Sequence, residues 1–222
     1  MANDPDAAQS ATPFRVVMFA DFICPYCYIG QERMEQLARD YDVQPIWRPH
    51  WLHPETPPEG APFPQNVDRE RARATAEWLK EMAPEKAARM RFPDKMQCSF
   101  FAFEAVEFAQ DRGRALPLTS AVYDALWVEG KDIARIATLQ EAAAKAGLDA
   151  EEMGRALRER TYMEQAMNAV TASRNAGISS TPTYILGRTA IKGWHYYEVF
   201  QTVMEKQGML PKNQSGESLK WK

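Results

Sequence analysis

Two cysteines separated by two residues are the strongest chemical signal in this sequence. They stand in the order Cys24-Pro25-Tyr26-Cys27. The nucleophile of thiol–disulfide exchange is a thiolate, and the pKa of about 8.5 in free cysteine leaves little thiolate at neutral pH. Pro25 suits the first turn of a helix, where the N–H that proline lacks is not needed. Cys24 would then lie at a helix N-terminus, where the helix dipole and unpaired N–H groups stabilise negative charge.

The spacing also assigns a role to each cysteine. Cys27 lies one helical turn after Cys24 and on the same face. It is close enough to attack a mixed disulfide at Cys24 and release the substrate. We therefore predict that Cys24 attacks and Cys27 resolves, and that Pro25 and Tyr26 contact the substrate.

A zinc half-site is the alternative for such a pair, but structural zinc usually has four Cys or His ligands. The other candidate ligands are Cys98, His50, His53 and His195, and there is no second Cys-x-x-Cys or His-x-x-x-His. The sequence thus favours redox chemistry, and we expect no metal site and no cofactor.

The remaining candidate residues have simpler interpretations. Cys98 is expected as a buried, inert thiol on a helix, because free cysteine packs like a small hydrophobe. His50 and His53 stand beside prolines and are expected in packing or at the surface. His195 is a hypothetical helper of proton transfer at Cys27, because histidine titrates near neutral pH.

The elements that position the cysteines form a β-α-β unit. An apolar, β-branched run predicts a strand over 14–19, and a helix follows from Pro25 to about residue 40. Residues 43–52 are extended in character, and Pro45 and Pro49 confine them to an edge strand or one with an irregular exit.

A long helical segment separates this unit from the end of the chain. Residues 53–66 are proline-rich and predict a linker, and from 67 to 177 only helical patterns occur. Two capping signals and one apolar stripe support helices there: Thr138 with Glu141, Asp149 with Glu152, and Met163, Met167 with Val170.

The β character returns near the C-terminus. Strands are predicted over 182–186 and 189–193, joined by a turn, and a helix over 196–206 with Val199, Phe200 and Val203 facing inward. We therefore predict an α/β chain with a discontinuous domain, residues 13–55 and 175–208, and a helical domain of residues 66–174 inserted into it. Residues 1–12 and 211–222 are expected as flexible tails.

Composition excludes several classes of function. The chain has 222 residues, 45% of them hydrophobic and 26% charged, with a net charge of −3. The sequence lacks the clustered positive charge of a nucleic-acid-binding surface. No apolar run in it is long enough for a membrane span. The polar, acidic N-terminus lacks the features of a secretory signal, so we expect a cytoplasmic protein.

Several segments resemble the DsbA-like oxidoreductases, specifically their FrnE-like branch. Residues 21–30 resemble the active-site signature, 48–54 the next segment, and 177–184 the cis-proline loop. The resemblance implies a thioredoxin-like fold with an inserted all-helical domain. It also implies a cis Thr181–Pro182 bond in a loop that faces the cysteines and pairs with an extended substrate.

The sequence departs from this family at three places. Ser180-Thr181 replaces the frequent Gly-Val, so that Thr181 offers a hydroxyl to a cysteine sulfur or a substrate. Residues 194–196 are more aromatic than usual. Tyr26 replaces the histidine of strongly oxidising members, so we expect a reduction potential between about −120 and −270 mV.

The resemblance leaves two activities open. The first is a thiol–disulfide oxidoreductase or isomerase acting on protein, peptide or small-molecule disulfides. The alternative is a glutathione-dependent transferase or isomerase of the kappa-class or 2-hydroxychromene-2-carboxylate isomerase type, in which the position of Cys24 is usually serine and the second cysteine is absent. Both cysteines are present here, which favours the first. Glutathione stays open as a partner because Cys-Pro-Tyr-Cys is also typical of glutaredoxins.

Overall fold

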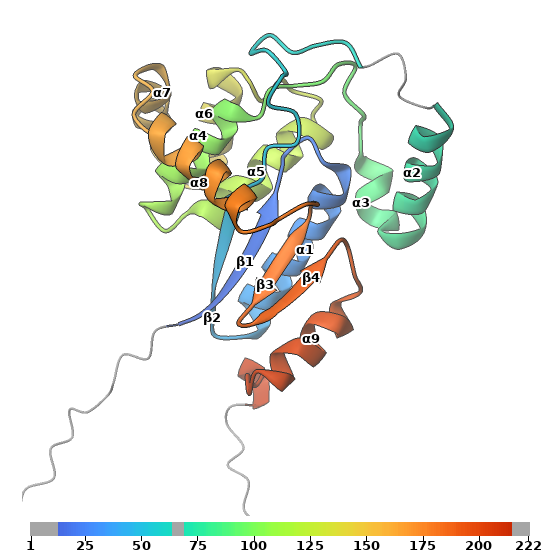
Figure 1. The fold of residues 1–222 in the computed structure, drawn as a ribbon. Coiled ribbons are helices and arrows are strands. Elements are labelled where there is room, and N and C mark those ends of the chain that lie inside the picture. The colour runs from blue at the N-terminus through green and yellow to red at the C-terminus, as the bar shows by residue number, and fades with distance from the viewer. Residues whose placement is uncertain (1–12, 64–68, 215–222) are drawn as a thin grey trace, which may run out of the picture.

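A mixed four-stranded sheet forms the centre of the computed structural model, which describes residues 13–63 and 69–214 (Figure 1). The strand order is β2-β1-β3-β4, with β1 parallel to β2 and the other pairs antiparallel. The strands are β1 (Phe14–Ala20), β2 (Val43–Pro49), β3 (Thr183–Leu186) and β4 (Thr189–Lys192). The end of the predicted linker and most of both predicted tails lie outside the described residues.

The β-α-β unit predicted from the first 52 residues is confirmed. Helix α1 (Pro25–Asp40) begins with proline in its first turn and ends where the apolar stripe ends. β2 is an edge strand, which agrees with Pro45 and Pro49, since a proline cannot donate a ladder hydrogen bond.

A close contact fixes α1 against β3. The Tyr184 hydroxyl donates to the Gly30 carbonyl over 2.9 Å, and both residues are buried. A Cβ atom on Gly30 would lie 2.3 Å from the Tyr184 hydroxyl oxygen, far inside contact distance. Glycine therefore allows the helix that carries the cysteines to approach the strand that follows the Thr181–Pro182 loop.

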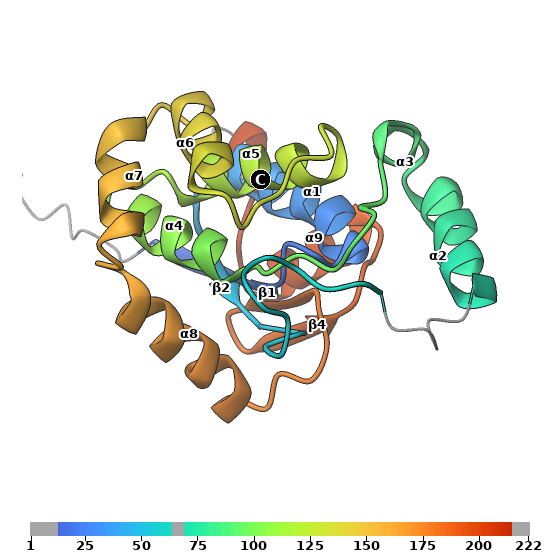
Figure 2. The same cartoon turned by 90° about the horizontal axis from the view of Figure 1, so that it is seen from above.

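The segment between β2 and β3 is helical, as predicted. Figure 2 shows it in two groups, with α2 and α3 on one side and α4 to α8 on the other. These helices are α2 (Arg69–Met82), α3 (Pro84–Arg89), α4 (Phe100–Gln110), α5 (Ala115–Trp127), α6 (Ile136–Lys145), α7 (Ala150–Arg158) and α8 (Met163–Asn175). After β4, helix α9 (Tyr197–Lys206) packs beside the sheet and a short 3-10 turn, Lys212–Gln214, follows.

One of the two predicted capping signals is wrong. Helix α6 already begins at Ile136 after the cap residue Arg135, so Thr138 lies inside the helix rather than before it. Thr138 is buried there, and its hydroxyl does not serve the helix start. The signal at Asp149 is confirmed, because its carboxylate accepts the Glu152 N–H over 2.9 Å at the start of α7.

The apolar stripe predicted on α8 faces the core only in part. Met163 and Met167 are 46% and 44% exposed, whereas Ala166, Val170 and Ser173 are buried. The helix thus turns a face of small residues toward β2 and α4, against which it packs. Small residues allow close approach, and the methionines are left on the solvent side.

The inward face of α9 differs from the prediction at one position. Phe200 is buried as predicted, and Val203 is half-buried. Val199 is 39% exposed, and Met204 takes its place in the core. Phe200 packs edge-on against Tyr184 of β3 with ring centroids 4.8 Å apart, which holds α9 against the sheet.

An aromatic core joins the sheet to the helical segment. Phe22 stacks on Trp47 with centroids 4.7 Å apart, and it lies 4.9 Å from Tyr123 and 6.2 Å from Phe103. The indole N–H of Trp127 donates to the Phe22 carbonyl over 2.8 Å. These contacts hold the stretch between β1 and the cysteines from three elements at once.

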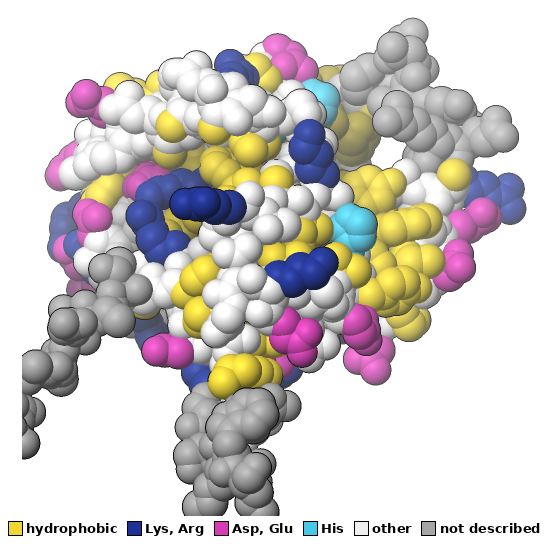
Figure 3. All heavy atoms as spheres, turned by 60° about the horizontal axis from the view of Figure 1, so that its bottom comes forward, with side chains coloured by type: hydrophobic (Ala, Val, Ile, Leu, Met, Phe, Trp, Pro, Cys, Tyr) yellow, Lys and Arg dark blue, Asp and Glu magenta, His cyan; other side chains and the backbone are white. Residues whose placement is uncertain are grey.

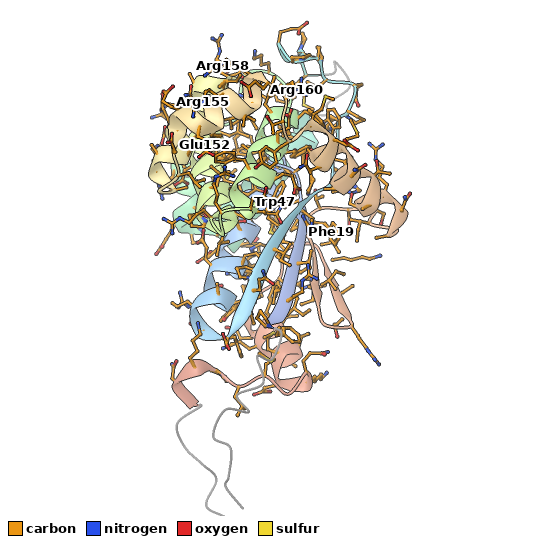
Figure 4. The ribbon with its side chains drawn as sticks, turned by 90° about the vertical axis from the view of Figure 1, so that its left-hand side faces the viewer. Phe19, Trp47, Glu152, Arg155, Arg158 and Arg160 are labelled. Atoms are coloured by element: carbon orange, nitrogen blue, oxygen red, sulfur yellow. The ribbon has the colours of Figure 1, made fainter. Side chains whose placement is uncertain are left out.

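Alternation along the strands gives the sheet two different faces. Trp47 is in register with Met18, and Phe19 is in register with Arg48. Neighbouring residues of a strand point to opposite faces, so Phe19 and Trp47, labelled in Figure 4, lie on opposite sides of the sheet. No helix in the described part of the chain is long and apolar enough to cross a membrane.

Candidate functional site

Cys24 and Cys27 lie at the start of α1, where the sequence predicts them. Cys24 is the N-cap residue and Pro25 follows in the first turn. The Cys27 N–H donates to the Cys24 carbonyl over 3.0 Å. Cys24 is 5% exposed and Cys27 is fully buried, and both are free thiols. Cys24 is thus the more accessible of the two thiols.

The loop before β3 faces Cys24. The Thr181–Pro182 peptide bond is cis, as the family resemblance implied. The Cys24 thiol donates to the Thr181 carbonyl over 3.8 Å, so the contact with sulfur is made by the backbone of Thr181. The Pro182 carbonyl accepts the Gly193 N–H over 2.7 Å, which joins the loop to the end of β4. Residues 157 positions apart are thereby brought together.

The two thiols have opposite electrostatic environments. A hydrogen bond from Cys27 is the largest influence that lowers the pKa of Cys24, and Thr181 adds to the lowering while burial opposes it. Burial raises the pKa of Cys27 well above its ordinary value, and the neighbouring Cys24 raises it further. The two directions favour the thiolate at Cys24 and the thiol at Cys27.

A buried carboxylate, Asp21, lies directly after β1 and is the first residue of the stretch 21–30 that resembles the family's active-site signature, but the sequence alone assigns its side chain no role of its own. It accepts hydrogen bonds from the Ser99 hydroxyl over 2.5 Å, the Leu52 N–H over 2.8 Å and the Ile23 N–H over 3.3 Å. Its carbonyl accepts the Cys24 N–H over 3.2 Å. Burial raises the pKa of Asp21.

Asp21 also acts on Cys24 through its charge. Its negative charge raises the pKa of Cys24, in opposition to the hydrogen bond from Cys27. The signal that could have identified it is its position, since a charged residue directly after a buried strand needs buried partners.

The Tyr26 side chain packs against helix α2. Its hydroxyl lies 3.2 Å from the Thr75 hydroxyl, and its ring packs edge-on against Trp78 at 5.2 Å. Trp78 in turn packs edge-on against Trp194 at 5.5 Å, and Trp194 lies 5.0 Å from Tyr196. We call Tyr26, Trp78, Trp194 and Tyr196 the aromatic cluster.

The aromatic cluster links the start of α1 to the chain after β4. Arg33 of α1 lies 5.0 Å from the ring centre of Trp194 and donates to the His195 carbonyl over 3.0 Å. The aromatic residues 194 and 196 were noted in the sequence as a departure from the family. Trp78 was missed, because nothing local shows that α2 returns to the cysteines.

The other candidate residues have contacts of their own. Cys98 precedes α4 instead of lying on a helix, and it is buried, with its pKa raised by burial. The His50 ring contacts the Ser173 hydroxyl at 3.0 Å, and His53 pairs with Glu55. The His195 ring donates to the Lys192 carbonyl over 3.0 Å. Within the ranges that the structure describes, no group of three or more Cys, His, Asp or Glu side chains is arranged to hold a metal ion.

Comparisons with known proteins agree with this architecture. The family model described as the DSBA-like thioredoxin domain matches residues 15–205. Among curated proteins, YwbO of Bacillus subtilis strain 168, described as uncharacterized, is 27% identical over 195 residues, which covers 86% of this chain and 96% of YwbO.

Three solved structures share the fold. A probable DsbA oxidoreductase from Streptomyces coelicolor has a TM-score of 0.74 at 24% identity and covers 94% of each chain. A 2-hydroxychromene-2-carboxylate isomerase has a TM-score of 0.68 at 18% identity, covering 87% of this chain and 94% of its own. The cytosolic disulfide reductase DsbM from Pseudomonas aeruginosa, solved with GSH, has a TM-score of 0.63 at 16% identity, covering 87% and 98%.

Proposed function

Since the chain belongs to the DSBA-like thioredoxin domain family, we propose that it is an enzyme of thiol–disulfide exchange, with Cys24 as the attacking and Cys27 as the resolving thiol. The observation that carries this proposal is the opposite influence of the environment on the two thiols. The pKa of Cys24 is lowered, and the pKa of the fully buried Cys27 is raised. This is the division of roles that the reaction requires.

The reaction proceeds in two balanced steps. The Cys24 thiolate attacks one sulfur of a substrate disulfide, a Cys24–substrate bond forms, and the other substrate sulfur leaves as a thiolate that takes up a proton. Cys27 then loses its proton and attacks the Cys24 sulfur. An internal disulfide forms, the second substrate thiol is released, and the substrate has gained the two electrons that the enzyme lost. The reverse sequence oxidises a substrate dithiol.

The loop at residues 181 and 182 supplies the substrate contact in this proposal. The Thr181 carbonyl already lies 3.8 Å from the Cys24 sulfur, so a chain laid along this loop would present its own sulfur to Cys24. Pro25 and Tyr26 border the same site from the start of α1. We propose disulfide- or thiol-containing proteins or peptides, or small disulfides including that of glutathione, as substrates. A cytoplasmic location remains part of the proposal and is supported by the described cytosolic location of DsbM.

Trapping of a mixed disulfide tests the assignment of roles. Cys27→Ser is expected to accumulate a stable adduct with a model peptide disulfide at Cys24, whereas Cys24→Ser is expected to form none. Cys98 is present in both variants and serves as an internal control. An adduct on Cys27 or Cys98 in the Cys24→Ser variant would contradict the proposal.

A glutathione-dependent transferase or isomerase is the second candidate, and the likeness to 2-hydroxychromene-2-carboxylate isomerase favours keeping it. Such a reaction needs glutathione at the site but no second cysteine. Under this alternative, Cys27→Ser retains full turnover of a glutathione-dependent reaction. Under our proposal it loses turnover and keeps only the adduct.

A further inference from the structure

A cavity of about 880 Å³ lies between helix α8 and the sheet face that carries Phe19. Its floor includes Val17 and Phe19 of β1 and Ile185 of β3, and neither Cys24 nor Cys27 lines it. Its volume falls within the range of about 300–1,000 Å³ that small-molecule sites occupy. It is therefore a second concave site on the molecule.

The sequence of α8 explains why this space is open. Ala169, Ala172 and Ala176 line the cavity from the helix side. Side chains of one carbon cannot reach the apolar strand residues opposite, so the gap between helix and sheet is not filled. The floor residues Val17, Phe19 and Ile185 are only half-buried as a result.

Positive charge borders this apolar space. Arg15 and Arg48 both line the cavity. Arg15 has no ion-pair or hydrogen-bond partner among the described residues. Arg48 donates to the Gln110 side chain over 3.0 Å and lies 3.6 Å from Glu107. Figure 3 shows hydrophobic side chains next to Lys and Arg side chains on the surface of the molecule.

Glu107 is the one acidic side chain in the lining. Its side chain is 12% exposed and already forms an ion pair with Arg48 over 3.6 Å, which leaves Arg15 as the cation without a protein partner among the described residues. The lining thus combines an apolar floor, a helix wall of alanines with Gln165 and Asn168, and two guanidinium groups, of which Arg48 is paired with Glu107 and Arg15 is unpaired within the described chain.

We propose that this cavity binds an amphipathic anion, namely a molecule with an apolar body of fatty-acid size and one carboxylate or sulfonate. The apolar body would lie on Val17, Phe19 and Ile185, and the anion would contact Arg15 and Arg48. Guanidinium groups pair well with carboxylates, and burial of the apolar body supplies most of the binding free energy. The site is independent of the cysteine chemistry.

Fluorescence of 1-anilinonaphthalene-8-sulfonate, displaced by oleate, tests the proposal on the full chain. Oleate is expected to displace the probe. Oleyl alcohol has the same apolar body without the charge, and it should need a roughly tenfold higher concentration to displace the probe, because a charge-assisted contact is lost. Arg15→Glu should weaken oleate by a similar factor, and Arg155→Glu, the same charge change outside the cavity, should leave it unchanged.

A second pair of variants tests the location. Ala172→Trp places a large ring in the cavity and should abolish displacement by oleate. Thr171→Trp adds the same ring to an exposed neighbouring position of α8 that does not line the cavity, and should bind like the wild type. Circular dichroism and cooperative thermal unfolding verify that each variant is folded. Equal binding by Ala172→Trp and the wild type, or equal potency of oleate and oleyl alcohol, would overturn the proposal.

Discussion

The Ser99 hydroxyl donates to the Asp21 carboxylate over 2.5 Å, which ties the residue after β1 to the residue before α4. The same carboxylate accepts the Leu52 N–H from the chain after β2. Asp21 therefore joins the stretch that precedes Cys24 to two segments that are distant in sequence, and its charge raises the pKa of the Cys24 thiol.

We predict that Asp21→Asn lowers the pKa of Cys24, because the charge of Asp21 raises it. The effect should be present above the pKa of Asp21 and vanish below it, where the wild-type carboxyl is also neutral. Ultraviolet absorbance of the thiolate during a pH titration measures this. Ser99→Ala is the control, since it removes a hydrogen bond but keeps the charge, and a lowered pKa in Ser99→Ala alone would refute the explanation by charge.

Alkylation of the reduced protein should follow the order of the two pKa values. The thiolate of Cys24 forms at lower pH than that of an ordinary cysteine, and the thiolate of Cys27 forms at higher pH. Iodoacetamide should therefore label Cys24 first, and labelling should fall as the pH drops through the Cys24 pKa. Peptide mapping by mass spectrometry gives the rate at each site. Faster labelling of Cys27 or Cys98 under native conditions would disagree with this order.

Tyr26→His should make the pair more oxidising. A histidine next to the helix N-terminus can carry positive charge beside the Cys24 thiolate, which stabilises the reduced form, whereas tyrosine cannot. We expect the reduction potential to rise by at least about 30 mV, which is a tenfold change in the equilibrium constant. Tyr26→Phe is the matched control, because it removes only the contact with Thr75. If Tyr26→Phe raises the potential as much as Tyr26→His does, charge is not the cause.

Arg160→Ala should destabilise the helical segment. Arg160 pairs with the fully buried Glu104 over 2.8 Å and lies 4.7 Å from the ring centre of Phe101. Removing it leaves a buried carboxylate unpaired. We therefore expect the free energy of unfolding to fall by about 2–3 kcal/mol. This loss is no larger than the loss for a fully buried ion pair, because Arg160 is partly exposed. Urea denaturation measures this loss.

Arg158→Ala provides the comparison for this variant. Arg158 is exposed and labelled near Arg160 in Figure 4, and its replacement should change the stability by less than about 0.5 kcal/mol. Adding Glu104→Gln to Arg160→Ala should recover part of the loss, because the unpaired charge is removed. Equal stability of the two arginine variants would show that the ion pair contributes nothing.

Local patterns in the sequence predicted the elements that carry the cysteines. Pro25 marked the start of α1, and the two prolines of β2 marked an edge strand. The same kind of pattern failed at Met163 and Met167, where packing decides which face of the helix is buried. A stripe of large apolar residues does not show that the small residues of α8 form its buried face. Thr138 failed for a related reason, since a capping pattern can also occur inside a helix.

The site was predictable in its covalent chemistry and not in its surroundings. The spacing of the cysteines identified the pair, and the family resemblance identified the Thr181–Pro182 loop. Asp21 and Trp78 act through contacts with segments more than thirty residues away, for which a sequence has no local signal. The domain boundaries and the FrnE-like branch remain predictions.

A redox titration of Cys24 and Cys27 in glutathione buffers, read by mass spectrometry of trapped thiols, tests the central claim most directly. We predict one reversible two-electron transition to an intramolecular disulfide, with a potential between about −120 and −270 mV and with Cys98 reduced throughout. A pair that never closes, with a stable glutathione adduct in its place, would contradict thiol–disulfide exchange and favour the glutathione-dependent alternative.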